Sequence, residues 1–288
     1  MSILPQLIAN SLIAGAIYLL VALGFNLIFS VTKFFNLAHG AMAVVAGYSV
    51  FYFGKMLGWN VYLVIILAVL IAGCLGFGVD KVVYRPLRRR KASNLVLLVA
   101  SLGVFTVLQA VIAILFSSQF QTISSLWPDN KVYEFNGAIM TQVQIVMLLA
   151  GLIIAALLAF VLKKTMFGKA VKAIGDDEEV AKIIGVDTNK IIGKVFFIGS
   201  AMAGLAGILV GVDTGLEPTM GLELLLNGII AAIIGGLGNL YGGVLGAFLL
   251  GFVENFGIWK IPGEWKAAIA FGLLIIFLLF RPQGIIKK

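Results

Sequence analysis

KKTMFGKAVKAIGDDEEVAKIIGVDTNKIIGK, residues 163–194, is a charged stretch between two long apolar segments of a 288-residue chain. It holds seven of the 21 lysines and arginines and five of the 13 acidic residues. A stretch with this many charges cannot lie in the apolar environment that the flanking segments require. It is therefore predicted to form a polar loop outside that environment.

A short helix is predicted inside this stretch, at about residues 177–184. Asp176 is a good N-cap, Glu179 can complete a capping box three residues later, and Gly185 is a typical stop signal. Three aliphatic residues share one face of the helix: Val180, Ile183 and Ile184. An apolar face on a helix in a polar loop indicates that a soluble partner docks there.

The composition is that of an integral membrane protein. Hydrophobic residues make up 61% of the chain, charged residues make up 12%, and the mean hydropathy is +1.09. Long uncharged runs recur from Leu7 to Phe280. Helices satisfy their own backbone groups in lipid, and the strict alternation of a membrane β-barrel is missing from these runs. An all-α, polytopic membrane bundle is expected.

The uncharged runs predict about nine spans, because a bilayer core needs about 20 residues of helix. They are residues 7–30, 36–53, 60–79, 94–116, 141–162, 195–212, 223–240, 242–258 and 265–280. The runs 223–240 and 242–258 can instead form one re-entrant pair. Either arrangement leaves the two termini on opposite sides.

The lysines and arginines predict the orientation. Of the 21 cations, four lie on one side of the predicted topology, which leaves 17 for the other side. Those four are Lys55, Lys131, Lys260 and Lys266. The positive-inside rule then puts the N-terminus outside, and the C-terminus and residues 163–194 in the cytoplasm. Residues 1–288 are expected to form a single transmembrane domain.

Several function classes are disfavoured by residue types. Cys74 is the only cysteine and His39 the only histidine, so a cysteine or histidine metal cluster is not expected. There is no GxxxxGK[ST] motif for ATP and no pairing of a nucleophile with a base. The net charge of +8 follows from membrane topology rather than from nucleic-acid binding.

Two polar or glycine-rich breaks interrupt the apolar runs. The first break lies at residues 36–40, where Asn36 can cap a helix and Gly40 allows close backbone approach. A helix that begins there and faces a cavity would attract a carboxylate, as in transporters with broken helices. The alternative is a satisfied polar cap near the interface. The second break, 235–243, contains five glycines. It is either a tight cytoplasmic hairpin or non-helical backbone around a cavity.

Glu254 is an acidic residue inside a predicted span. Carboxylates within a membrane usually indicate function. The alternative is a position near the external end of the span, where Glu254 is paired with Lys260.

The motifs of the chain resemble those of a transporter family. Glu179-Val180-Ala181, followed by Gly185, resembles the Glu-Ala-Ala…Gly loop of ABC importer permeases, with valine where alanine is usual. Further segments are similar to landmarks of LivH-type branched-chain amino acid permeases: Phe35–Gly40, Tyr84–Arg88, Gly168–Ala173, Gly235–Asn239 and Arg281–Gly284. Lys169 and Lys172 stand where arginine is common. These landmarks run in order along essentially the whole chain.

The resemblance implies the permease subunit of an ABC uptake system in the bacterial inner membrane. Its partners would be a second related permease, two cytoplasmic ATPase subunits, an extracytoplasmic substrate-binding protein and the surrounding lipid, but no nucleic acid. The chain would be no enzyme and would bind no cofactor, because the partners hydrolyse ATP. Closure of the ATPases would pull the 177–185 helix and drive alternating access for leucine, isoleucine or valine.

Two groups of site residues follow from the motifs. Coupling to the ATPase is expected of Gly168, Ala170, Ala173, Asp176, Glu179, Ala181 and Gly185. The substrate path is expected to include Asn36, His39, Gly40, Gly235, Gly236, Gly238, Asn239 and Glu254.

Two other functions remain open at this point. The nearer one is the same architecture moving urea or short-chain amides, whose permeases share these landmarks. The more distant one is a stand-alone ion-coupled transporter with Glu254 as its proton or sodium site, which leaves the helix at 177–184 unexplained.

Overall fold

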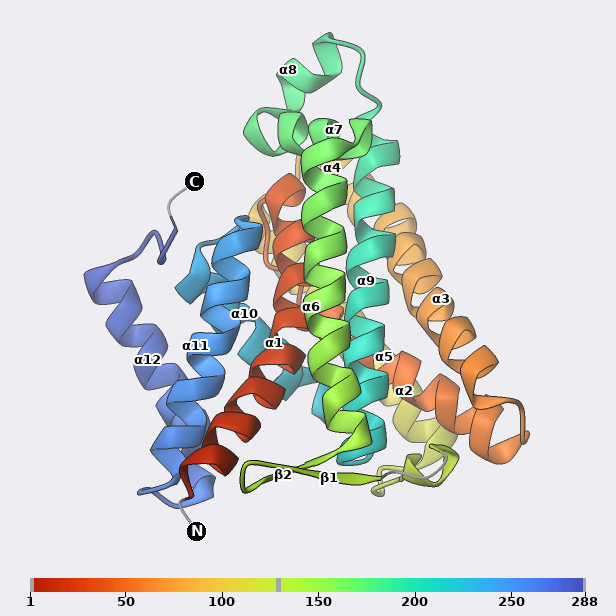
Figure 1. Cartoon of the computed structure of the whole chain (residues 1–288). Coiled ribbons are helices and arrows are strands. Elements are labelled where there is room, and N and C mark those ends of the chain that lie inside the picture. Colours follow the sequence, from red (N-terminus) through yellow and green to blue (C-terminus); the bar gives the residue numbers. More distant parts are fainter. Residues whose placement is uncertain (1–2, 128–130, 287–288) are drawn as a thin grey trace.

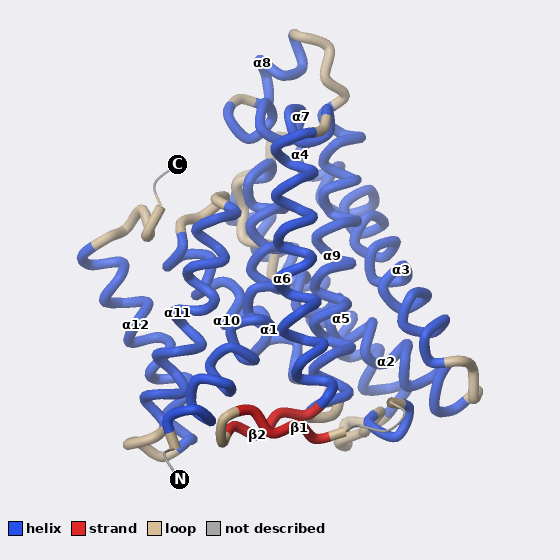
Figure 2. Tube along the Cα trace, in the orientation of Figure 1, coloured by secondary structure: helices blue, strands red, loops and turns tan. Residues whose placement is uncertain are grey.

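The computed structural model describes residues 3–127 and 131–286 as a helical bundle with one small β-hairpin (Figures 1 and 2). The long helices are α1 (Leu4–Thr32), α3 (Val61–Val79), α5 (Asn94–Phe116), α6 (Gln142–Lys164), α9 (Thr188–Asp213) and α11 (Leu240–Ile258). The shorter ones are α2 (Ala38–Val50), α4 (Arg85–Arg89), α7 (Met166–Asp176), α8 (Glu178–Ile183), α10 (Met220–Gly235) and α12 (Lys266–Phe280). The expected all-α membrane fold is confirmed.

Short irregular elements join these helices. Two π-helical turns, η1 (Phe51–Met56) and η2 (Asp80–Tyr84), continue α2 and α3, so that Val61–Arg89 is one continuous helix. Two 3₁₀ turns are η3 (Ser124–Leu126) and η4 (Gly263–Trp265). The hairpin consists of β1 (Val132–Phe135) and β2 (Ala138–Thr141), which pair antiparallel.

Side-chain caps fix where several helices begin. Thr141 accepts a hydrogen bond from the amide of Gln144, whose side chain bonds back to the Thr141 amide, so α6 opens with a capping box. The side chains of Asn60 and Ser93 cap α3 and α5 in the same way. Each cap satisfies amide groups that a helix start would otherwise leave unpaired at the edge of the membrane.

Seven helical segments are long and apolar enough to cross a membrane. They are Leu4–Thr32, Val61–Arg89, Asn94–Phe116, Gln142–Lys164, Thr188–Asp213, Leu240–Ile258 and Gly263–Phe280. The two remaining predicted runs, 36–53 and 223–240, form the shorter helices α2 and α10. Each of these two follows a non-helical stretch, 33–37 or 214–219, that enters the bundle before the helix begins. With its continuation η1, the first run is helical over residues 38–56, and the second is helical from Met220 to Gly235.

The two ends of the bundle differ. We call the end that carries α7 and α8 the α8 end, and the end that carries β1 and β2 the hairpin end (Figure 1). The N-terminal part of α1 lies at the hairpin end and the C-terminal segment at the α8 end, as an odd number of passages requires. Which end faces the cytoplasm stays a prediction from the positive-inside rule.

α1–α2–α3 and α9–α10–α11 repeat one another in opposite direction. Each set is a long helix, a short non-helical stretch, a short helix and a further helix. α1 ends at Thr32 and α9 ends at Asp213. The same separation in sequence relates Gly40 of α2 to Gly221 of α10. Packing follows the repeat, since α1 packs chiefly on α11 and α3 chiefly on α9. Such inverted repeats are common in transporters.

The first turns of the two short helices meet inside the bundle. A Cβ atom on Gly221 would lie 2.6 Å from the carbonyl oxygen of Gly40, and a Cβ atom on Gly40 would meet the carbonyl oxygen of Gly221. Nearby, the long helices α1 and α9 cross where Gly24 faces the Gly199 backbone. Glycine at these four positions lets four backbones approach at the centre of the fold.

α1 forms the centre of the core. Leu19, Leu20, Ala22 and Leu23 have no exposed surface. The outer helices instead expose aliphatic and aromatic side chains: Ile114 on α5 is 82% exposed, and Phe280 on α12 is 80% exposed. Exposed apolar side chains on outer helices are what a lipid environment requires.

Replacing Gly40 by valine is expected to destabilise the bundle by about 1–3 kcal/mol, because the new side chain would push α2 away from α10. The thermal unfolding midpoint of the purified chain in detergent measures this. Gly103→Val is the matched control, since an added Cβ atom there meets nothing within 4 Å. Equal midpoints for the two variants would contradict the close packing of α2 on α10.

Candidate functional site

The α8 end carries a compact platform formed by α7. The hydroxyl of Thr165 caps α7 by accepting from the Gly168 amide at 3.2 Å. Gly168 is buried, and a side chain there would collide with the backbone of Leu162 at the end of α6. Val171 and Ile174 bury the inner face of the same helix. α7 is thus fixed against the bundle and provides a base for α8.

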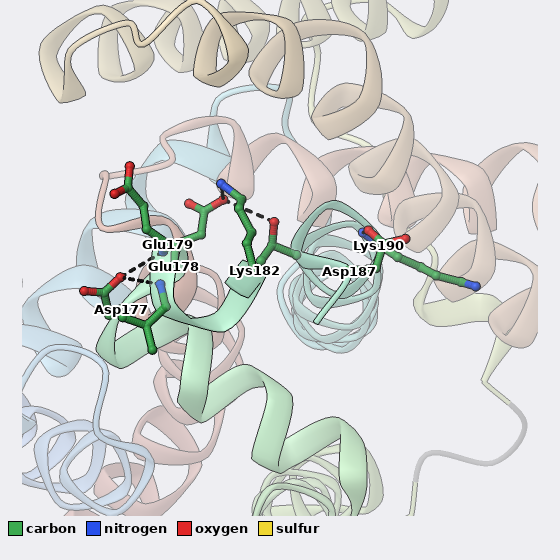
Figure 3. A network of polar contacts seen from close by, with 8 residues as sticks. Asp177, Glu178, Glu179, Lys182, Asp187 and Lys190 are labelled. Carbon is green, nitrogen blue, oxygen red and sulfur yellow. Dashed lines mark hydrogen bonds and ion pairs between the residues drawn. The ribbon is translucent and has the colours of Figure 1, made fainter. Parts of the chain in front are cut away.

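α8 is capped at both ends. Oδ1 of Asp177 accepts hydrogen bonds from the amides of Glu179 at 2.8 Å and Val180 at 3.0 Å (Figure 3). At the other end Gly185 has φ = +88°, and its amide donates to the Lys182 carbonyl. The next amide, of Val186, donates to the Ala181 carbonyl, which completes a Schellman motif.

The prediction that Asp176 is the N-cap of this helix was wrong. Asp176 is the last residue of α7, and Asp177 adopts the extended backbone of an N-cap with φ = −153°. Glu179 therefore does not take part in the predicted capping box. The predicted helix itself and its glycine stop are confirmed by the structure.

Glu178 makes one polar contact within α8 and one that joins α8 to α9. Lys182 forms an ion pair of 2.8 Å with Glu178 one turn earlier, and the hydroxyl of Thr188 at the start of α9 donates to the same carboxylate at 3.3 Å (Figure 3). Oδ1 of Asp187 caps α9 by accepting from the Lys190 amide at 3.1 Å. On the inner side of α8, Ala181 is 1% exposed. The helix is therefore tied to both α7 and α9.

The outer face of α8 is apolar and uncovered. Val180 is 53% exposed, Ile184 67% and Ile183 83%. α8 and its C-cap residue thus expose three aliphatic side chains. The helix lies at the end of the molecule that is farthest from the hairpin (Figure 1). Among the coupling residues expected from the sequence, Ala170 and Ala173 lie half-buried on α7.

Asn36 lies in the non-helical stretch before α2 and is 2% exposed. Its Oδ1 accepts a hydrogen bond of 2.8 Å from the hydroxyl of Tyr84 in η2. Its predicted role as side-chain cap of α2 was wrong, because the first residues of α2 are held only by backbone bonds. The side chain instead ties the stretch to the end of α3.

The backbone around Asn36 finds its partners on α5. The amide of Leu37 donates to the Ser101 hydroxyl at 3.0 Å. The single hydroxyl hydrogen is shared between the Leu98 carbonyl of the same helix at 2.7 Å and the Phe35 carbonyl at 3.3 Å. Ser101 has no exposed surface. One serine thus satisfies polar backbone atoms that would otherwise be unpaired in the membrane.

His39 is fully buried in the first turn of α2. Its Nε2 lies 3.3 Å from the carbonyl oxygen of Val21 on α1, to which it donates when protonated. The edge of the Phe25 ring packs against the imidazole. Among the described residues, nothing forms a hydrogen bond with Nδ1.

The glycine-rich break is a capped turn between α10 and α11. The side chain of Asn239 caps α11 by accepting from the amides of Tyr241 and Gly242. Asn26 of α1 accepts from the Gly238 amide at 3.0 Å and donates to the Asn239 carbonyl at 3.3 Å. Of the two interpretations left open by the sequence, the structure has the tight hairpin.

Gly235 and Gly236 let this turn pack against other backbone. Gly235 lies against the backbone of Gly242, and Gly236 has φ = +117°. The C-terminal segment closes over them, because the amides of Ile285 and Ile286 donate to the carbonyls of Ile234 and Gly235.

A pocket of about 480 Å³ separates the glycine-rich turn from α7. The residues on the α7 side include Gly168, Val171, Lys172 and Gly175, and those on the turn side include Gly238, Asn239 and Tyr241. The turn and the coupling platform therefore face one another across a space at the α8 end.

Glu254 is 1% exposed and lies far along α11. Its Oε2 accepts a hydrogen bond of 2.6 Å from the hydroxyl of Tyr18 and lies 3.6 Å from the ammonium of Lys266. The predicted pairing with Lys260 was wrong: that ammonium lies 4.8 Å from the centre of the Trp259 ring. Glu254 thus links α1, α11 and α12.

The expected path residues are not gathered in one place. His39 contacts α1 at Val21, whereas Gly238 contacts it at Asn26. Since residues five apart on a helix point in different directions, the two groups lie on different faces of α1. Glu254 forms a third, separate group. Sequence reasoning missed Asn26 and Tyr84, although both are polar residues next to or within apolar runs.

Comparison with known proteins relates the chain to transport proteins over most of its length. Residues 7–278 match the family described as "Branched-chain amino acid transport system / permease component". The chain is 30% identical over 295 residues to the high-affinity branched-chain amino acid transport system permease protein BraD of Pseudomonas aeruginosa, which covers 98% of this chain and 95% of that protein.

Two further relatives are similar to different extents. The high-affinity branched-chain amino acid transport system permease protein LivH of Escherichia coli K12 is 29% identical over 98% of this chain and 95% of its own. The autoinducer 2 import system permease protein LsrC of Escherichia coli is 31% identical over 56% of this chain and 52% of its own.

Replacing Asp177 by alanine is expected to destabilise α8 by about 0.5–2 kcal/mol, because two amides lose their acceptor. Amide hydrogen exchange over residues 178–184 should become about two- to thirtyfold faster. Glu179→Gln, which keeps the cap, is the control. Unchanged exchange in the alanine variant would show that the Asp177 cap does not hold the helix.

Proposed function

This chain belongs to the family of permease components of branched-chain amino acid transport systems, and we propose that it is the membrane subunit of an ATP-driven importer. It is a multi-pass protein of the cell membrane and a transport subunit rather than an enzyme. The proposed cargo is leucine, isoleucine or valine. The proposed mechanism is alternating access driven by separate ATPase subunits.

The observation that carries the coupling role is the uncovered apolar face of α8. Val180, Ile183 and Ile184 are all more than half exposed on a helix that is capped at both ends. Such a face stabilises a complex when a partner groove removes it from water. We assign that groove to the ATPase subunit, because the α8 end is the end that the positive-inside rule puts in the cytoplasm.

The connections of α8 suggest how a movement would be transmitted. Glu178 is tied to α9 through Thr188, and α7 packs against α1 and α6. A displacement of α8 would therefore reach the two long helices that cross at Gly24 and Gly199. The remaining partners in the proposal are a second related permease and, at the hairpin end, a substrate-binding protein.

The proposed path passes the place where α2 and α10 begin. Two helix N-termini approach there at Gly40 and Gly221, and the amide ends of helices favour the carboxylate of an amino acid. His39 supplies an imidazole nitrogen without a partner beside them. This arrangement supports Asn36, His39 and Gly40 as path residues, whereas 235–239 belongs to the cytoplasmic side of the path.

Two alternatives need a direct comparison. The similarity to an autoinducer 2 import permease supports the idea that this architecture serves more than one class of solute, and urea or a short-chain amide is the nearest other cargo. The stand-alone ion-coupled transporter receives less support, because it gives no role to the exposed apolar residues of α8 and because Lys266 lies 3.6 Å from Oε2 of Glu254, the residue it needs as an ion site.

Proteoliposomes that contain this chain with its partner subunits should take up leucine only when ATP is supplied, and unlabelled leucine but not urea should compete. Ile183→Glu should lower uptake at least about tenfold, because a charge would have to enter an apolar groove. Met166→Glu, equally exposed at the same end but outside α8, should keep it.

Uptake that persists without any ATPase would overturn the ATP-driven mechanism. Uptake that urea abolishes and leucine does not would overturn the proposed cargo while leaving the coupling role intact. Normal uptake by the Ile183 variant would remove α8 from the coupling site.

His39→Ala is expected to lower leucine uptake at least about tenfold at an unchanged protein level, since a buried polar contact on the path is lost. Ser49→Ala is the matched control, because Ser49 lies on the same helix and bonds only within it, to the Val45 carbonyl. Both variants should unfold at similar temperatures. Full uptake by the His39 variant would exclude His39 from the path.

A further inference from the structure

A basic pocket lies at the α8 end of the long helix Val61–Arg89, away from the residues discussed above. It has a volume of about 400 Å³ and is lined by Lys81, Arg85, Pro86, Arg89 and Arg90. Four of these five side chains are cationic. The pocket is formed by η2, by α4 and by the residue that follows α4.

Among the cations that line the pocket, Arg85 interacts electrostatically with the buried Asp80 carboxylate, but no close ion pair forms. Within the described residues, none of them lies within ion-pair distance of a carboxylate. The neighbouring Arg88 differs, because its guanidinium contacts the Asp80 carboxylate at 2.8 Å. Asp80 is therefore engaged chiefly by Arg88, and Lys81, Arg89 and Arg90 have no carboxylate within ion-pair distance among the described residues.

The inner side of this segment is anchored. Asp80 is 2% exposed and Tyr84 has no exposed surface. The Tyr84 hydroxyl bonds to Asn36, and its ring packs edge-on against Phe34 at 5.1 Å between centroids. With the inner side fixed, the opposite side of η2 and α4 presents its cations from a rigid backbone. π-helical turns of this kind often occur at functional sites.

Arg85 provides an independent sign that a ligand is missing from the protein itself. Its Nε atom is buried, and nothing among the described residues accepts a hydrogen bond from it. A buried guanidinium donor without an acceptor costs free energy. Arg88, which lies outside the pocket, likewise has buried donors at Nη1 and Nη2 without a hydrogen-bond partner, although Nη1 forms the ion pair with Asp80. Within the pocket the Arg85 side chain is one of the lining groups, and phosphate oxygens match guanidinium geometry well.

The surroundings of the pocket identify where that oxygen comes from. Val82 is 74% exposed next to Lys81, and Leu95, just after the loop that follows α4, is 70% exposed. Exposed aliphatic side chains on membrane helices face acyl chains. The pocket therefore lies where hydrocarbon gives way to headgroups.

We propose that this pocket binds the headgroup phosphate of an anionic phospholipid. Lys81 and Arg89 supply charge from the exposed rim, and Arg85 supplies the buried donor. Basic pockets between membrane helices on the cytoplasmic side are suited to cardiolipin and other anionic headgroups. The positive-inside rule explains cations at this end of the chain, but it does not explain their concentration around one concavity with a buried unpaired donor.

The test is lipid binding to the full-length chain, purified in a neutral detergent and measured by native mass spectrometry. Cardiolipin, phosphatidylglycerol, phosphatidylcholine and inorganic phosphate are titrated separately. The variant K81Q/R85Q/R89Q should bind cardiolipin and phosphatidylglycerol on the order of 10- to 100-fold more weakly than the native chain. The control K164Q/K169Q/K190Q, which removes three exposed cations of the same end, should stay within about twofold.

The other outcomes overturn the proposal. Equal losses in both triple variants would mean that only the total charge matters. Unchanged binding in the pocket variant would exclude the pocket, and inorganic phosphate that binds without any lipid binding would make it a site for a soluble anion. Should the triple variant unfold, R89Q alone, at an exposed position, gives the same comparison with K164Q.

Discussion

Hydrocarbon offers no partner to a peptide group, and the arrangement of this chain follows from that constraint. A non-helical stretch can enter the bundle only where other side chains satisfy it. Residues 33–37 meet this condition through Ser101, which accepts from the amide of Leu37, and through Asn94, which donates to the carbonyl of Lys33. Tyr84 holds the same stretch by donating to the side chain of Asn36. These contacts allow α2 to begin inside the bundle instead of at its surface.

The same contacts connect parts of the molecule that are far apart in sequence. Tyr84 holds the stretch before α2 on its inner side, while the cations of the basic pocket project from the other side of η2 and α4. At the far end of the bundle, Glu254 joins α1, α11 and α12 through Tyr18 and Lys266. Polar groups inside this bundle thus act mainly as links between helices.

The sequence predicted most features that depend on neighbouring residues. All nine apolar runs are helical, and the helix in the charged stretch ends at Gly185 as expected. The choice between Asp176 and Asp177 as N-cap failed because it depends on where α7 ends, which packing against the bundle decides. The run 223–240 extends past the end of α10 because residues 236–239, which are glycine-rich, leave the helix in a turn that hydropathy does not register.

Contacts between distant residues were beyond the sequence for a different reason. Lys260 and Lys266 are both near Glu254 in the chain, but only the placement of α12 brings the second one to the carboxylate. Tyr84, Asp80 and Ser101 carry no local pattern that names their partners. The roles proposed for the coupling and path residues come from the family resemblance and the geometry together, and they stay predictions.

The inverted repeat has a thermodynamic consequence. In such a repeat, the two sets of helices α1–α2–α3 and α9–α10–α11 can exchange their conformations. This exchange converts a conformation that is open to one side into one that is open to the other side. If both halves had the same sequence, the two conformations would have equal free energy. Under the proposed alternating access, the difference between them then derives from the substitutions between the halves and from whatever binds at each end. The asymmetric charged stretch at 163–194, which has no counterpart inside the first half, is the place where such a bias can be applied.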